Sequence, residues 1–202
     1  MHNLQYKFKK AIQAVNYFAT SSGGKIPKLK AIKLLWLADR LHVRNYGRTI
    51  SGDTYFAMKL GPVASSTLDI LNGRTFDKTL SPYIEYSKQF IKLEDKNTLK
   101  SISDVNKKVL SNTDIEVLDS IIGEYLSIEK YDLSHNISHH FPEWTRFKKY
   151  FQSKEVGGRY KMDMNDFFKD MPDYALFGEE DQEIKEIAKS LFTDKQAVFN
   201  CL

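Results

Sequence analysis

Apolar residues recur every three to four positions at the start of the chain, which is the spacing of one face of an α-helix. The stripe consists of Leu4, Phe8, Ile12, Val15 and Phe18. It predicts a helix over about 4–20, ended by the Ser-Ser-Gly-Gly run at 21–24. A short turn would then bring the following segment back against this helix, so that the two pack as a pair.

The following segment is rich in leucine, alanine and lysine, which are strong helix formers. We expect a helix of four to five turns that starts at Pro27, runs through Val43 and ends at Gly47. At about 100° per residue, its two opposite faces are Lys30, Lys33, Arg40 and Arg44 on one side, and Ala31, Leu35, Ala38 and His42 on the other. The basic face is therefore expected to be exposed and the His42 face to be buried.

His42 points into the core in this arrangement, and Asp39 lies at the edge of the same inward half. The Asp39 carboxylate can then reach either the His42 ring or the backbone of the following turn. A buried polar group without a partner costs about 1–3 kcal/mol, so both side chains should be hydrogen-bonded inside the fold or line a cleft. We expect them to be structural rather than catalytic.

The region after Gly47 alternates turn residues with β-formers. Residues 49–50 and 55–58 flank a Gly52-Asp53 turn and predict a small hairpin, and Pro62 is expected to open a helix that ends at Asn72-Gly73. Residues 83–86 and 89–93 are expected to be extended, with 98–102 returning as the second half of a hairpin.

The second half of the chain reads as mainly helical. Ser111 precedes a helix with an inner stripe of Ile115, Leu118, Ile122 and Tyr125, and a short helix should cover 132–140. After residue 150 we expect a hinge at 157–158, a short helix at 165–171 and a last helix with Ile184, Ile187, Ala188 and Leu191 on its inner face. The predicted fold is mainly α with small β-hairpins (α+β): one compact domain over 1–150 and a helical extension, 151–202, packed on it.

The chain has 202 residues, of which 42% are apolar, and can bury one substantial core. Its single cysteine, Cys201, excludes a disulfide within the chain and fits a reducing compartment. No apolar run approaches the ~18 residues of a membrane span, and the N-terminus lacks the apolar core of a signal peptide. We therefore expect a cytoplasmic protein with no membrane contact.

The net charge of +4 is unevenly distributed. Residues 1–50 carry ten Lys and Arg against one acid, whereas the remainder carries an excess of five acids. Such a dipole could orient a charged partner, including nucleic acid at the basic N-terminal third, or consist of ordinary solvated faces. Direct reading of DNA is disfavoured because the basic helix is apolar around most of its circumference.

Two histidines, His135 and His139, are spaced as a pair of zinc ligands would be on one helical face. A zinc site needs a third and often a fourth ligand, and only a distant acid could supply it, so we expect neither a metal nor another cofactor. His139 is instead expected in the core, near Asp39 and His42, with Trp144 packed below it.

Several short motifs occur in order along the first three quarters of the chain. They are KLLWLADRLH at 33–42, Tyr46-Gly47-Arg48, Ser51-Gly52-Asp53-Thr54-Tyr55, Ala57-Met58 and Gly61-Pro62-Val63, then Leu133-Ser134, Ile137-Ser138-His139 and Trp144. Together these motifs resemble the signature of the Panacea domain family, also described as GepA/SocA-like antitoxin proteins. The resemblance extends over roughly 5–150.

This resemblance implies an antitoxin of a type II-like toxin–antitoxin system, which neutralises a co-encoded protein toxin by direct contact. Some family members act instead as adaptors that deliver a toxin to a protease, and an autoregulatory DNA-binding role is a further alternative. No enzymatic reaction is established for the family. An enzyme using Asp39, His42 and His139 is the least favoured class, because the sequence shows no nucleophile motif, phosphate loop or paired catalytic carboxylates.

The family motifs and the divergent tail supply separate candidate interface residues. The motif positions are Asp39, His42, Tyr46, Gly47, Ser51, Gly52, Asp53, Tyr55, Gly61, Pro62, His139 and Trp144. The tail positions are Phe177, Glu179, Glu180 and Asp181, whose acids would face a basic toxin surface. Because the tail lies outside the shared signature, it is the expected source of toxin specificity, with the turns at Gly52 and at Gly61-Pro62 as the second candidate surface.

Overall fold

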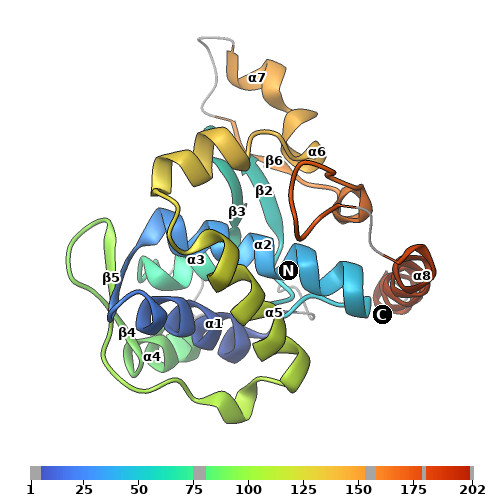
Figure 1. The fold of residues 1–202 in the computed structure, drawn as a ribbon. Coiled ribbons are helices and arrows are strands. Elements are labelled where there is room, and N and C mark those ends of the chain that lie inside the picture. Colours follow the sequence, from blue (N-terminus) through green and yellow to red (C-terminus); the bar gives the residue numbers. More distant parts are fainter. Residues whose placement is uncertain (1–5, 75–80, 153–157, 179–180, 201–202) are drawn as a thin grey trace.

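The computed structural model describes residues 6–74, 81–152, 158–178 and 181–200. One helix, α2 (Lys28–Tyr46), runs through the middle of the molecule (Figure 1). It packs against α1 (Phe8–Ser21), α5 (Asn112–Tyr125), α8 (Gln182–Asn200) and strand β3 (Gly61–Ala64). The predicted first two helices are confirmed, and α2 ends at Gly47, which takes the left-handed conformation with φ of 60°.

Two small antiparallel sheets flank this helical centre. In the first, β5 (Thr98–Ser101) lies between β1 (Lys25–Pro27) and β4 (Ile91–Leu93). In the second, β2 (Tyr55–Met58) lies between β3 and β6 (Tyr160–Lys161). The mainly helical α+β fold class is therefore confirmed.

Short helices connect these elements. They are α3 (Ser65–Leu71), α4 (Ser81–Lys88), the 3-10 helix η2 (Lys107–Val109), the π-helix η3 (Asp132–Ile137), α6 (Pro142–Thr145), α7 (Lys148–Gln152) and the 3-10 helix η4 (Met164–Phe168). No helix in the described ranges combines the length and the apolar character that crossing a bilayer requires. One hydrophobic core runs from α1 to α8 and includes Phe167, Phe177 and Phe192 from beyond residue 150. The division into two regions at 150 stays a prediction.

The expected exposed basic face of α2 is wrong. Every residue from Lys30 to Arg44 is buried. The chain returns over this face and supplies acceptors from far along the sequence: Glu143 for Arg40, Asp170 for Arg44 and the Pro62 carbonyl for Lys33. These acceptors are distant in sequence, so helical periodicity gives no sign of them. A prediction from periodicity alone therefore places the basic face in solvent.

The expected hairpin between 49–50 and 55–58 is also wrong. β2 pairs with β3, in the register Tyr55 to Ala64 and Met58 to Gly61, so the turn lies at residues 59–60. Pro62 is consequently in a strand, and the helix begins three residues later, at Ser65. The predicted end at Asn72-Gly73 is confirmed, with Gly73 at φ of 63°.

Residues 83–86, expected to be extended, lie in α4. Their aromatic rings pack against α1, where Phe8 stacks on Tyr83 at 4.1 Å between ring centroids and meets Tyr86 edge-on at 5.5 Å. Aromatic residues favour strands in isolation, but here this packing decides the local conformation. The hairpin formed by β4 and β5 is confirmed.

The later helices agree with the sequence in position and differ in part in which faces are buried. α5 begins with a capping box between Ser111 and Asp114, and Leu118 and Tyr125 are buried as predicted, whereas Ile115 and Ile122 are half-buried. The short helices near 132–140 and 165–171 are present as η3 and η4. The predicted hinge begins at residue 157, which lies outside the described residues.

Candidate functional site

The Asp39 carboxylate is fully buried and binds the loop that follows α2. Its Oδ1 accepts hydrogen bonds from the backbone N–H of Ile50 at 2.7 Å and of Ser51 at 3.0 Å. Its Oδ2 accepts from the Tyr55 hydroxyl at 2.8 Å and from the Ser51 hydroxyl. Burial raises the pKa of the Asp39 carboxyl, against the opposing effect of these donors. The carboxylate thus takes the backbone of the next turn, one of its two expected partners, and holds that turn in place.

Asp53 likewise uses its carboxylate to hold a later segment of the backbone, the start of α3. It accepts hydrogen bonds from the backbone N–H groups of Ser66 at 2.9 Å and Thr67 at 2.8 Å, which are unpaired donors of the first turn of α3. It also accepts from the Thr67 hydroxyl at 2.7 Å. Burial raises the pKa of the Asp53 carboxyl. Asp53 therefore caps α3 from a distance and fixes where that helix begins.

The His42 ring is buried and connects α2 to α5. Its Nδ1 lies 2.8 Å from the Arg48 carbonyl oxygen, so this nitrogen carries the proton and donates it. Its Nε2 lies 3.1 Å from the Asp114 carboxylate, which also binds Lys10 and Arg48. Although burial alone would raise the pKa of Asp114, the bonds from His42 and Lys10 hold it well below its ordinary value. His42 does not pair with Asp39.

Gly61 lies where α2, β3 and η3 meet. A Cβ at this position would come within 2.3 Å of the Ser138 hydroxyl oxygen and 2.7 Å of the Lys33 Nζ, and φ is +96°. Lys33 Nζ donates to the Pro62 carbonyl at 2.6 Å, and burial lowers the pKa of this amine well below its ordinary value. Ser134 closes the contact by donating to the Leu60 carbonyl at 2.7 Å. Glycine is required here because three elements approach the backbone closely.

His139 stacks on Trp144, with 3.6 Å between ring centroids and 10° between ring planes. Trp144 Nε1 donates to the Met58 carbonyl at 2.8 Å, so this aromatic pair covers the end of β2. Burial, and then the neighbouring His135, lowers the pKa of His139 from 6.5 to about 4. The expected packing of Trp144 against His139 is confirmed. His139 does not, however, contact Asp39 or His42, contrary to the expectation from the sequence.

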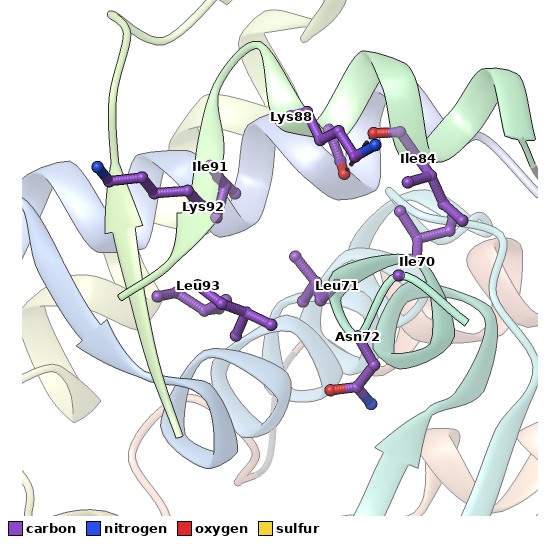
Figure 2. A pocket seen from close by; sticks show the side chains of 11 residues that line it. Ile70, Leu71, Asn72, Ile84, Lys88, Ile91, Lys92 and Leu93 are labelled. Atoms are coloured by element: carbon purple, nitrogen blue, oxygen red, sulfur yellow. Dashed lines mark hydrogen bonds between the residues drawn. The ribbon is translucent and has the colours of Figure 1, made fainter. Parts of the chain in front are cut away.

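The three candidate acid–base groups therefore do not form one site. Asp39 binds the 50–55 loop, His42 binds α5 and His139 binds Trp144. The described groove of about 210 Å³ is lined by other residues, from α3, α4, β4 and β5 (Figure 2). Within the described ranges, no three His, Cys, Asp or Glu side chains are grouped as metal ligands would be.

The turn positions expected to meet a partner are largely buried. Gly52, Gly61 and Pro62 lie inside the fold, and between them only Lys59 and Leu60, at the tip of the β2–β3 turn, are exposed. Tyr46 is half-buried, and its hydroxyl donates to Glu116 at 3.0 Å. The expectation of an exposed Gly52 to Pro62 edge is wrong, because Asp39, Asp53 and Lys33 tie that segment to the core.

The last helix, α8, packs against α2 through its Ala188–Phe192 face. Ala188 and Phe192 are buried at 2% and 7% exposure, and a Cβ on Gly47 would lie 2.5 Å from the Ala188 carbonyl oxygen. Asp170 ties the helix down, because it accepts from Arg44 at 2.8 Å and from Lys185 at 2.7 Å. Gly47 is thus both the end of α2 and the seat of α8.

A second apolar stripe on α8 faces solvent. It consists of Ile184, Ile187, Leu191 and Val198, whose exposed fractions are 52%, 55%, 46% and 62%. The stripe lies about 100° around the helix from the Ala188–Phe192 face. The predicted inner face is therefore correct for Ala188 and wrong for the two isoleucines and Leu191.

The tail candidates lie in different environments. Phe177 is fully buried, 4.8 Å from the Arg40 guanidinium, so it cannot meet a partner and is a correction to the predicted surface. Glu179 and Glu180 lie outside the described residues. Asp181 is exposed and accepts from the backbone N–H of Glu183 at 3.0 Å at the start of α8.

We compared the sequence with models of known protein families. The family model for SocA-like antitoxins with a Panacea domain matches residues 32–145, more than half of the chain. This chain belongs to the SocA-like Panacea family. No curated protein and no solved structure matches it.

The Panacea match extends from the second turn of α2 to the end of α6. It therefore includes all twelve motif residues. The exposed stripe of α8 lies entirely outside it. Family membership supports an antitoxin role in general, and a protein toxin is the partner that such a role requires.

Proposed function

We propose that this protein is an antitoxin that neutralises a co-encoded toxin by direct contact through the exposed face of α8. The observation that carries the proposal is the exposed apolar stripe of Ile184, Ile187 and Leu191, with Val198 two turns further on, which lies beyond the Panacea match. Exposed apolar stripes of this kind mark interaction sites, and their burial against a partner stabilises the complex. The motif residues provide the scaffold that positions the helix.

Acidic residues on the outer border of the stripe favour a basic toxin surface, whereas the exposed Lys195 lies on its inner border. Glu183 and Asp194 are exposed and lie on the side of the stripe that faces away from the core, by the helical angle. Complementary charge increases the association rate and selects against wrong partners. The proposed partner of the exposed α8 face is accordingly a toxin with an apolar contact patch and basic residues beside it.

The protein acts by binding rather than by catalysis in this proposal, because Asp39, His42 and His139 are each committed to separate structural contacts. Nucleic acid contact is not favoured. Four of the ten basic residues in 1–50 are buried in α2, and Lys10 and Arg48 pair with Asp114. Much of the positive charge is therefore used inside the fold.

A growth experiment tests the antitoxin role. The reading frame next to this gene is expressed alone and together with this protein. We expect arrest in the first case and growth in the second; a neighbour that is harmless when expressed alone overturns the proposal. Toxin half-life, measured after translation is stopped, separates occlusion from delivery to a protease: an unchanged half-life supports occlusion, and rapid loss only in the presence of this protein supports an adaptor.

A further inference from the structure

A groove separate from α8 lies between α3, α4 and β4 (Figure 2). Its floor is formed by the side chains of Ile70, Leu71, Ile84, Ile91 and Leu99, which are all nearly buried. Leu93 stands at its mouth and is 41% exposed. The volume of about 210 Å³ is sufficient for a large aliphatic or aromatic side chain, since cavities of about 150 Å³ hold benzene.

The strand beside the groove has a free edge. Among the described strands, β4 pairs only with β5. The Phe90 carbonyl accepts from the Ile102 N–H at 2.9 Å, and the Glu94 N–H donates to the Thr98 carbonyl at 3.0 Å. These two bonds show which residues of the strand direct their backbone groups toward β5. Because these directions alternate along an antiparallel ladder, the N–H and C=O groups of Ile91 and Leu93 point away from β5. An added strand could therefore bond to them.

The groove is bordered by positive charge. The charged residues among its described lining are Lys88 and Lys92, and Lys88 lies between Ile84 and Ile91 in Figure 2. Lys28 donates to Asn72 at the other end, at 2.5 Å. Glu85 binds Lys88 at 2.7 Å, but both side chains are about two-thirds exposed, at 67% and 64%, so the pair is weakly held. Burial, then Arg74 and Lys96, lowers the pKa of Lys28, and Asp95 opposes this shift.

We propose that this groove binds an extended peptide segment that pairs with the edge of β4, inserts an aliphatic side chain between Ile84 and Leu93, and carries acidic residues beside it. The free backbone groups fix the peptide as a strand, the apolar floor selects the inserted side chain, and the lysines select the acids. This site is distinct from the α8 face, and its test requires no toxin.

The probe is a fluorescent peptide of about seven residues with two leucines at alternate positions and aspartate or glutamate elsewhere, because alternate side chains of a strand share one face. Its binding to the full chain is measured by anisotropy. We expect a dissociation constant of roughly 10–100 μM, as for short peptide contacts, and at least about tenfold weaker binding of the same peptide with lysines in place of its acids. Equal binding of the two peptides overturns the charge assignment.

Two matched comparisons locate the site. Leu93→Asp should weaken binding of the acidic peptide at least about tenfold. Leu60→Asp, at the equally exposed tip of the other sheet, should leave this binding unchanged. Methylating alternate backbone nitrogens of the peptide should abolish binding in one register and spare it in the other. Equal effects of the two protein variants, or of the two methylation registers, would overturn the proposed pairing with β4.

Discussion

Arg40 and Glu143 form a fully buried ion pair, with 3.1 Å between the Arg40 Nε and a Glu143 carboxylate oxygen. The same carboxylate oxygen accepts from the Trp36 indole at 3.2 Å, and Arg40 lies 4.8 Å from the ring centroids of both Phe141 and Phe177. Burial raises the pKa of Glu143, and the Arg40 charge opposes that shift. One glutamate thus joins the centre of α2 to α6, the last helix of the Panacea match.

Glu143→Ala should destabilise the protein by about 3–5 kcal/mol, because Arg40 then stays buried without this carboxylate. Chemical denaturation measures the change, and Glu143→Gln, which keeps the shape and one acceptor, should cost less. Glu85→Ala, in the exposed pair with Lys88, is the control and should cost less than about 1 kcal/mol. Similar losses at positions 143 and 85 would contradict a structural role for the buried pair.

Asp39→Ala removes the acceptor for four donors of the 50–55 loop and should cost about 3–5 kcal/mol of stability. Since we assign the residue to the scaffold, the folded fraction of the variant at low temperature should still bind toxin with nearly wild-type affinity. Binding is measured on material shown by circular dichroism to be folded. A variant that is stable yet inactive would identify Asp39 as a contact residue.

Acid should weaken the fold through His139. Its pKa is lowered from 6.5 to about 4 in the folded state, so the unfolded chain binds more protons between these values and stability falls as the pH drops through this window. Because His139 is only half-buried, we expect a loss of about 1–2 kcal/mol rather than the full value of the shift.

The measurement is the free energy of unfolding at pH 7 and pH 4.5 for the wild type and for His139→Phe, which keeps a ring on Trp144. The variant should lose less stability on acidification than the wild type. Identical losses in the two proteins would assign the acid sensitivity to other groups.

Gly47 and Gly73 have nearly the same φ, at 60° and 63°, and differ in their surroundings. A Cβ on Gly73 meets nothing within 4 Å, whereas one on Gly47 meets the Ala188 carbonyl oxygen at 2.5 Å. Gly73→Ala should therefore cost about 1 kcal/mol, from backbone strain alone. Gly47→Ala should cost at least about 1 kcal/mol more and should increase hydrogen exchange throughout α8. Equal costs would mean that α8 does not depend on this seat.

The features that local chemistry determines could be predicted from the sequence. The capping box of α5 uses residues three positions apart, and Gly47 ends α2 through its own backbone freedom. The β4–β5 hairpin depends on a short turn in which Asp95 binds the N–H groups of Asn97 and Thr98. Each of these signals lies within a few residues of the structure that it specifies.

The features that distant contacts determine could not be predicted in this way. Arg40 can be buried because Glu143 and the Lys169 carbonyl accept its hydrogen bonds. These two acceptors lie 103 and 129 positions further along the chain. Four cations on one face of this largely apolar helix, Lys30, Lys33, Arg40 and Arg44, were a usable signal that acceptors would come from elsewhere in the chain. On α8, two adjacent faces are apolar, and the sequence does not specify which one the end of α2 covers.

Titration calorimetry with the toxin encoded next to this gene measures whether the exposed face of α8 binds that toxin. The test variant is Ile187→Lys with Leu191→Lys, which places two cations on the stripe and leaves Ala188 and Phe192 in place. Glu186→Lys is the control, because it makes the same change in net charge on another exposed face of the helix. We expect the double variant to keep its melting temperature and to lose at least about 100-fold in affinity, and the control to change it less than about threefold. Equal, undiminished affinity of both variants for the toxin would mean that the exposed face of α8 does not bind it.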